Sequence, residues 1–217
     1  MEILTNIIGE LRMIIACLDL EGVLVPEIWI AVAEKTGIED LRLTTRDISD
    51  YDKLMKHRIS ILDKYKIDIK LIQEVINKIE PLQGAVEFVE KLREKFQIII
   101  LSDTFYQFGM PLMKKLGNPT LFCHNLVVNE TGKIIDYKLR MADQKREAVK
   151  RLKELNFNII ASGDSYNDTN MLSVADYGVL FCPPQRVIDE FPQYSVALNH
   201  EELFNYFIQA EKEIIKQ

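Results

Sequence analysis

The stretch IIACLDLEG, residues 14–22, decides the fold of this 217-residue chain. Its apolar first half is typical of a strand covered on both faces, as in a parallel α/β sheet. Asp19 and Glu21 follow at the strand's carboxyl end, the edge where ligands of such sheets bind. Because residues i and i+2 of an extended chain point to the same side, we expect both carboxylates to face one site. The alternative is that they are solvated loop acids. Gly22 permits a sharp turn after them.

Composition narrows the class of protein. The apolar fraction of 47% is enough for a buried core, and the net charge of −6 argues against nucleic acid or an anionic membrane as partner. The three cysteines are far apart and form no CxxC pair, so we expect buried free thiols rather than disulfides or a zinc site. We find no apolar run of membrane-spanning length and no signal-peptide pattern. These features predict a cytoplasmic protein of one domain, or of a core domain with an insertion.

An inserted helical segment interrupts the strand pattern. Residues 26–81 hold helical stretches at 26–37, at 51–64 and before Pro81, with no strand between them. We expect this segment to be a small helical cap. Residues 1–12 show helical spacing and form an N-terminal extension, either incidental or a functional arm.

Helix and strand patterns alternate after the insertion, so we expect residues 13–25 and 82–217 to form the α/β core. The strands are expected at residues 97–101, 157–161 and 178–181, with a hairpin at 125–128 and 133–139. This order predicts an α/β fold with a doubly wound parallel sheet and a helical cap inserted after its first strand.

Three predicted strands end in polar residues, which a parallel sheet brings to one edge. These residues are Asp19 with Glu21, Ser102, and the run of Gly163, Asp164, Asn167 and Asp168. Clustered carboxylates repel each other unless a cation holds them, and such oxygen ligands suit Mg²⁺. A nucleophile, a metal and a hydroxyl donor are requirements of phosphoryl transfer, together with a fixed cation. Lys145 can supply that cation because Asp143 marks a helix start; Lys138 and Lys150 are alternatives.

The ordered motifs resemble those of the haloacid dehalogenase superfamily. They are Asp19-Leu20-Glu21-Gly22, Leu101-Ser102-Asp103-Thr104, Lys145 and Gly163-Asp164-Ser165-Tyr166-Asn167-Asp168. The helical insertion after the first motif is similar to the cap of the phosphoserine phosphatase branch. The residues within the motifs resemble those of members of this branch that also use homoserine as a phosphoryl acceptor. The resemblance implies a Mg²⁺-dependent phosphatase that acts on phosphoserine through an aspartyl-phosphate and also transfers the phosphoryl group to homoserine. It further implies a monomer or homodimer.

The resemblance also assigns a role to each motif residue. The expected catalytic residues are Asp19 as nucleophile, Glu21 as general acid and base, Ser102 as phosphoryl hydrogen-bond donor and Lys145 as neutralising cation. The expected Mg²⁺ ligands are Asp19, the backbone carbonyl of Glu21, and Asp164. Asp168 is expected to orient Lys145 or a metal-bound water from behind, and Asn167 to support metal or substrate.

Two cap residues are expected to bind the amino-acid part of the substrate. The resemblance places Glu27 on its ammonium group and Arg58 on its carboxylate. Arg58 also lies on the apolar stripe of the helix expected at 51–64, where a guanidinium needs an anionic partner. The alternatives are that Glu27 only complements a helix dipole and that Arg58 forms a structural ion pair.

The motifs depart from the usual pattern at two places. Most superfamily phosphatases carry aspartate where this chain has Glu21, and we expect the longer side chain to slow attack by water so that an acceptor hydroxyl competes. Asp103 and Thr104 replace a glycine pair, which should reshape the floor of the substrate pocket. Two other functions remain open: a phosphatase of another small phosphorylated metabolite, and a catalytically silent binding module, which an Asp19→Asn variant would distinguish.

Overall fold

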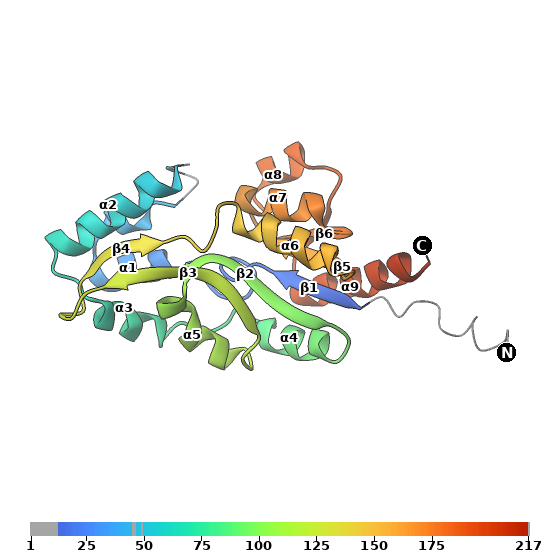
Figure 1. Ribbon diagram of the computed structural model, residues 1–217, viewed down its shortest axis with the longest axis horizontal. Helices are drawn as coiled ribbons and strands as arrows, with labels where there is room; N and C mark the ends of the chain where they lie inside the picture. Colours follow the sequence, from blue (N-terminus) through green and yellow to red (C-terminus); the bar gives the residue numbers. More distant parts are fainter. Residues whose placement is uncertain (1–12, 45–46, 49, 217) are drawn as a thin grey trace.

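The computed structural model describes residues 13–44, 47–48 and 50–216, in which seven strands form one sheet between two layers of helices (Figure 1). The strands are β1 (Ile14–Leu18), β2 (Gln97–Phe105), β3 (Thr120–Val128), β4 (Ile134–Lys138), β5 (Asn158–Gly163), β6 (Tyr177–Phe181) and β7 (Ser195–Ala197). Their order is β4-β3-β2-β1-β5-β6-β7, and only the β3–β4 pair of these is antiparallel. The predicted α/β fold is confirmed. The predicted extension, residues 1–12, lies outside the described residues.

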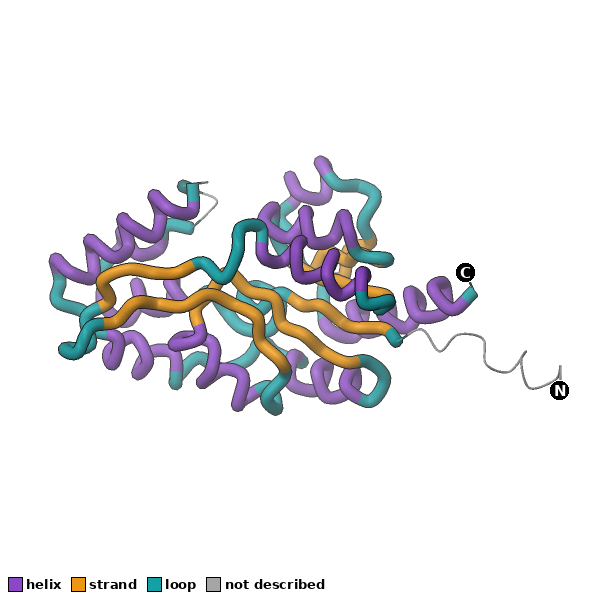
Figure 2. Tube along the Cα trace, in the orientation of Figure 1, coloured by secondary structure: helices purple, strands orange, loops and turns teal. Residues whose placement is uncertain are grey.

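Helices cover both faces of the sheet, as Figure 2 shows. They are α1 (Ile28–Thr36), the 3₁₀ helix η1 (Glu39–Arg42), α2 (Tyr51–Lys64), α3 (Ile69–Ile76), α4 (Ala85–Arg93), α5 (Tyr106–Lys115), α6 (Gln144–Glu154), α7 (Tyr166–Val174), α8 (Gln185–Glu190) and α9 (His200–Ile215). One apolar cluster joins the sheet to α4, α5 and α9, and a second joins it to α6, α7 and α8. No helix of the described residues is long and apolar enough to cross a membrane.

Strand β1 is the centre of the sheet, and all its side chains are buried. Its last residue, Leu18, pairs with Ile100 of β2 on one side and Ser162 of β5 on the other. The Asp19 backbone N–H extends this pairing by donating to the Ser162 carbonyl at 2.9 Å. The carboxyl ends of β1, β2 and β5 therefore meet at one edge of the sheet, with the polar motifs on it.

Helices α1, α2 and α3 lie between β1 and α4 in the chain, and the β3–β4 hairpin supports them. The Tyr137 hydroxyl donates to Asp52 at 2.7 Å, and Lys133 Nζ lies 2.5 Å from Asp63 Oδ1. The Ile69 N–H donates to the carbonyl of Gly132 at the hairpin turn, at 2.9 Å. Apolar side chains of the three helices join the cluster on the α4, α5 and α9 face. The boundaries of a separate cap at residues 26 and 81 therefore stay a prediction.

Several elements differ from the predicted ones. Strand β2 continues to Phe105, because its pairing with β3 resumes there after a register shift that displaces the segment 102–104. Strand β3 begins at Thr120, since its first half pairs with β2 and only its second half forms the predicted hairpin. Helices α7 and α8 and strand β7 were not expected. Cys17 and Cys123 are buried free thiols, but Cys182 is exposed because it lies in the turn after β6.

Candidate active site

The carboxylate of Asp19 lies at the carboxyl end of β1 and is buried. Its Oδ1 accepts a hydrogen bond from the Leu20 N–H at 2.7 Å and lies 2.8 Å from Lys145 Nζ. Lys145, in the first turn of α6, also lies 2.7 Å from Asp168 Oδ1. One buried ammonium group thus links two carboxylates that come from different elements. Lys150 instead pairs with Glu147 on the outside of α6.

Asp168 is fixed at the start of α7. Its Oδ2 accepts from the backbone N–H groups of Asp164 and Ser165, at 3.0 and 3.1 Å, and Ser165 completes a capping box with it. A Cβ on Gly163 would lie 2.2 Å from the Asp168 Cγ, so only glycine leaves room for this carboxylate. Both Asp168 oxygens thus have hydrogen-bond partners, and its carboxylate fixes the position of the Lys145 ammonium group.

Three buried carboxylates, those of Asp19, Asp164 and Asp168, form a cluster that fits a metal ion. Their oxygen atoms lie within 4.8 Å of one another, and Lys145 is the ammonium group among them. Clustered carboxylate oxygens of this kind suit a divalent cation. Gly22, at φ +80°, makes room for this arrangement, because a Cβ there would lie 2.6 Å from Asp164 Cγ.

Charge and burial shift the pKa values in this cluster. Burial raises the pKa of Asp19 well above its usual range, and Asp168 and Asp164 act in the same direction while Lys145 opposes them. Burial alone would lower the pKa of Lys145, but Asp168, Asp19 and Asp103 outweigh it and raise that pKa. Lys145 is therefore a permanent cation.

Glu21 lies beside Asp19 on the turn that follows β1. Its Oε2 accepts a hydrogen bond from the Ile28 N–H at 2.8 Å, so the N-terminus of α1 holds the carboxylate. Burial raises the pKa of Glu21 to about 7, and the Glu27 carboxylate adds to the shift, whereas the Ile28 N–H, Arg58 and Lys145 oppose it. A carboxyl group with this pKa can both donate and accept a proton near neutrality.

Ser102 lies in the displaced segment of β2, at the edge of the site. Its Oγ accepts a hydrogen bond from the Thr104 N–H at 3.3 Å, which leaves the hydroxyl hydrogen available to a ligand. The Gln144 side chain, at the start of α6, donates to the Ser102 carbonyl. Irregular strand segments of this kind are common beside active sites because they re-aim a side chain.

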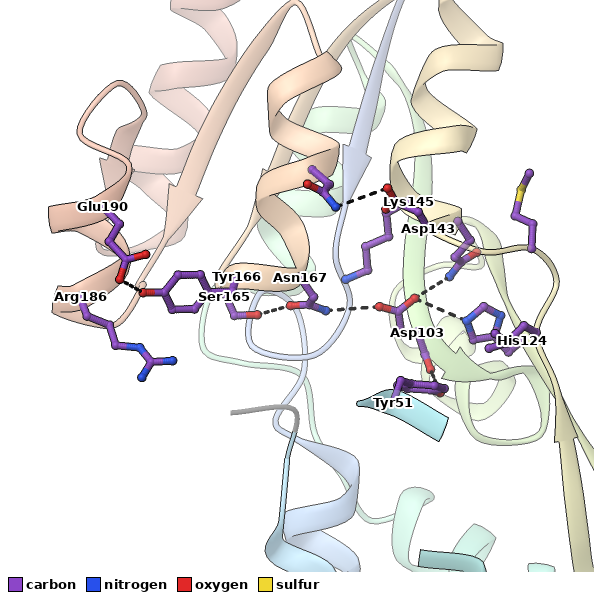
Figure 3. Close-up of a pocket in the computed structure, with 14 residues that line it drawn as sticks. Tyr51, Asp103, His124, Asp143, Lys145, Ser165, Tyr166, Asn167, Arg186 and Glu190 are labelled. Atoms are coloured by element: carbon purple, nitrogen blue, oxygen red, sulfur yellow. Dashed lines mark hydrogen bonds and ion pairs between the residues drawn. The ribbon is translucent and has the colours of Figure 1, made fainter. Parts of the chain in front are cut away.

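The carboxylate of Asp103 contacts side chains of three elements, α6, α7 and β3 (Figure 3). It accepts from Asn167 Nδ2 and Gln144 Nε2, both at 3.3 Å, and its Oδ1 lies 3.5 Å from His124 Nε2. Burial alone would raise the pKa of Asp103, but Lys145 and His124 lower it below its usual range. Asp103 therefore stays ionised and rigidly held. His124 is buried beside the site.

Arg58 and Glu27 bring charges of opposite sign to the cap side of the site. Arg58 is buried, lies 4.6 Å from the centre of the Trp29 ring and donates to the Leu43 carbonyl at 2.8 Å. Burial lowers its pKa to about 10, and its Nε has no hydrogen-bond partner among the described residues. Glu27 is the N-cap residue of α1, but its side chain makes no capping bond. In the described part of the chain, neither side chain forms an ion pair.

A cavity of about 80 Å³ collects every predicted site residue except Asp168, which lies behind it. These residues are Asp19, Glu21, Glu27, Arg58, Ser102, Lys145, Asp164 and Asn167. Sequence reasoning gave no role to other lining residues, chiefly Trp29 and Tyr51, whereas Asp103 and Thr104 line the cavity as expected of its floor. The spacing of seven between Tyr51 and Arg58, which puts them on one face of α2, is the signal that could have found Tyr51.

Family comparison identifies the chain. The family model of haloacid dehalogenase-like hydrolases matches residues 15–176. The chain belongs to this family. The resemblance found in the motifs is thereby confirmed, and the buried Asp19 cluster lies where the motifs place it. This hydrolase is 57% identical over 210 residues to the phosphoserine phosphatase of Pseudomonas syringae pv. tomato, an alignment covering 97% of this chain and 89% of that protein. It is also 57% identical over 196 residues to "Phosphoserine phosphatase ThrH" of Pseudomonas aeruginosa, covering 90% and 96%.

Solved structures support the fold of this hydrolase. A phospho-aspartyl intermediate analogue of phosphoserine phosphatase superposes with a TM-score of 0.74 at 21% identity, covering 90% of this chain and 99% of that one. Phosphoserine phosphatase from T. onnurineus superposes with a TM-score of 0.69 at 26% identity, covering 90% and 94%. The arrangement of helices around the parallel sheet is therefore shared with these proteins.

Proposed function

We propose that this hydrolase removes the phosphoryl group from phosphoserine through an aspartyl-phosphate and also transfers it to homoserine. The observation that carries the proposal is the pair Arg58 and Glu27, which lines the same cavity as Asp19 without an ion pair among the described residues. A buried guanidinium with an unpartnered Nε suits a carboxylate, and an unpaired carboxylate suits an ammonium group. Phosphoserine carries both groups beside its phosphate. The names of the two Pseudomonas relatives support this substrate.

In the first half-reaction, a carboxylate oxygen of Asp19 attacks phosphorus and the bond between phosphorus and the serine oxygen breaks. The leaving oxygen takes a proton from the carboxyl group of Glu21, and serine departs. The Ser102 hydroxyl donates to a phosphoryl oxygen, while Lys145, 2.8 Å from Asp19, offsets charge on the aspartyl and phosphoryl groups. The product is an aspartyl-phosphate on Asp19 and an ionised Glu21.

In the second half-reaction, Glu21 acts as a base. It takes a proton from water or from the homoserine hydroxyl, whose oxygen attacks phosphorus. The bond between phosphorus and the Asp19 oxygen breaks, which restores the Asp19 carboxylate and the protonated Glu21. The products are inorganic phosphate or phosphohomoserine. The same residues thus serve both acceptors.

We propose Mg²⁺ as the cation of the carboxylate cluster, held by Asp19, Asp164 and the backbone carbonyl of Glu21. When bound, it supplies positive charge that lets Asp19 approach an anionic phosphate ester. Asp168, whose oxygens are engaged by Lys145 and two backbone N–H groups, orients Lys145 instead of binding the metal. Asn167, held by Asp103, faces the same cavity and supports metal or substrate.

A phosphatase of another small phosphorylated metabolite is the second candidate. It keeps the chemistry of Asp19 but gives Arg58 and Glu27 no zwitterion to bind, as with a sugar phosphate. A silent binding module is disfavoured, because the nucleophile, acid, cation and hydroxyl donor all line one cavity.

The test is phosphate release from phosphoserine with Mg²⁺, with and without excess homoserine, while phosphohomoserine is followed directly. We expect phosphohomoserine to appear as free phosphate falls, because both acceptors compete for one aspartyl-phosphate. Phosphate release that homoserine leaves unchanged would refute the transfer activity alone. No release from phosphoserine, with turnover of another phosphate ester, would establish the second candidate.

A further inference from the structure

A second cavity, of about 790 Å³, adjoins the catalytic one. It opens between the starts of α6 and α7, and its walls include His124, Tyr166 and Arg186 (Figure 3). Among the described residues, those that line both cavities are Tyr51, Asp103, Lys145, Ser165 and Asn167. Tyr51 is the member of this set that comes from the helices inserted after β1; the other four belong to the sheet edge and to α6 and α7.

Tyr51 is tied to the phosphoryl-binding segment. Its hydroxyl donates to the Asp103 carbonyl at 2.7 Å, and Asp103 directly follows Ser102. The Asp103 side chain is itself anchored by Asn167 and Gln144, so the accepting carbonyl belongs to a rigid part of the core. Burial and the nearby Asp103 raise the pKa of Tyr51 above its ordinary value, so the phenol remains a donor throughout the neutral range.

The position of Tyr51 in α2 links this contact to substrate binding. Tyr51 is the first residue of α2, and Arg58 lies two turns later on the same face, above the catalytic cavity. The Tyr51 ring packs edge-on against His124 and Tyr137, with ring centres 6.1 and 5.8 Å away. One helix therefore carries both the residue for the substrate carboxylate and one residue of the wall between the two cavities.

We propose that Tyr51 is a gate residue, whose bond to the Asp103 carbonyl keeps the water of the large cavity away from the aspartyl-phosphate and so favours transfer to an amino-acid hydroxyl. This inference rests on the proposed function. Water attack on the aspartyl-phosphate forms inorganic phosphate, restores the Asp19 carboxylate and passes one proton to Glu21. Transfer does the same with the acceptor oxygen. The ratio of hydrolysis to transfer depends on which oxygen reaches phosphorus. The residues between the two cavities, Tyr51 among them, control the access of water from the large cavity.

The experiment measures the ratio of inorganic phosphate to phosphohomoserine formed from phosphoserine at a fixed homoserine concentration. Tyr51→Phe removes the hydroxyl but keeps the ring contacts that support the fold. We expect the ratio to shift toward inorganic phosphate by about three- to tenfold, the scale of one lost neutral hydrogen bond. Tyr137→Phe is the matched control. The Tyr137 hydroxyl belongs to the same aromatic cluster and also holds α2, because it donates to Asp52. Tyr137 lines neither cavity.

A branching ratio is independent of the fraction of active enzyme, so a loss of folded protein alone leaves it unchanged, and Tyr137→Phe reports any effect of a shifted α2. An unaltered ratio in Tyr51→Phe, or an equal shift in Tyr137→Phe, would overturn the gate while leaving the proposed function intact. Phosphate release without any phosphohomoserine in the wild type would overturn both the transfer activity and the gate. No phosphate release from phosphoserine would overturn the proposed function as a whole, and the gate with it.

Discussion

Lys145 is the residue on which the charge balance of the site depends. It contacts Asp19 and Asp168, and Asp164 adds a third carboxylate to the cluster. Removing one carboxylate charge therefore relieves repulsion within the fold, although the same charge is needed for attack on phosphorus. A residue that is unfavourable for stability and necessary for chemistry is expected at an active site.

Asp19→Asn separates these two effects. We expect phosphate release from phosphoserine to fall by roughly 10⁴-fold or more, the scale of losing a catalytic nucleophile. We also expect the metal-free variant to melt no lower than the wild type, because repulsion with Asp164 and Asp168 is reduced. Phosphate assays and thermal melts check both points, with Asp40→Asn on the exposed 3₁₀ helix η1 as the control that changes neither. A marked loss of stability would contradict this account of the cluster.

Glu21→Asp tests the unusual length of the acid and base. The shorter side chain withdraws the carboxylate from the Ile28 N–H, which now holds it at 2.8 Å, and leaves room for water beside phosphorus. We expect hydrolysis to rise relative to transfer, by about two- to fivefold for the loss of one hydrogen bond. The measurement is again the ratio of phosphate to phosphohomoserine. An unchanged ratio would remove side-chain length as the reason for transfer.

At the scale of elements, much of the fold could be predicted because local patterns agree with it. The apolar run of β1, the amphipathic stretch of α2 and the start of α6 are all visible in the sequence. Strands β2 and β3 were too short in the prediction, since their continuation depends on pairing across the sheet that no local pattern contains. Helix α7 was missed because its first turn, Tyr166 to Asp168, reads as a polar loop motif.

In the candidate site, too, the residues that local patterns place could be predicted, and those that depend on contacts between distant segments could not. Residues in motifs at strand ends could be found from the sequence, since a parallel sheet necessarily brings such ends together. Asp143 is the N-cap residue of α6 as predicted, although its side chain makes no capping bond, and Lys145 follows in the first turn, at the site. Tyr51 reaches the site through the packing of α2 on the β3–β4 hairpin, and His124 through the pairing of β3 with β2; both are contacts between distant segments.

The turn after β1 allows a test of how closely Gly22 and Asp164 must approach each other. Gly22→Ala places a Cβ 2.6 Å from Asp164 Cγ in a left-handed backbone, whereas Gly37→Ala has the same backbone at the end of α1 and nothing within 4 Å. Both variants should lose about 1–2 kcal/mol in the free energy of unfolding from backbone strain. Only Gly22→Ala should also lose most of its activity, since Asp164 must shift. Urea unfolding and phosphate release would show this, and equal activity of the two variants would contradict it.

At the scale of the whole molecule, local charge and net charge act in the same direction. The chain carries a net charge of −6, and the buried group of Asp19, Asp164 and Asp168 is also made of acidic residues. An anionic phosphate ester is thus attracted by Lys145 and by a bound cation rather than by the overall field. A metal ion bound by these carboxylates would couple metal binding to folding, because they come from the turn after β1, from α7 and from the loop between β5 and α7.

Metal removal should therefore lower the stability of the entire chain. At free Mg²⁺ of about 100 times its dissociation constant, a ligand that binds only the folded state adds about 2.7 kcal/mol. For a chain of this size we expect the melting temperature to rise by roughly 5–10 °C over that in a chelator. Asp164→Asn, which removes a ligand charge, should lose most of this shift, while Asp40→Asn should keep it. A shift of equal size in Asp164→Asn would place the stabilising ion elsewhere, and the carboxylate cluster would then need another source of compensation.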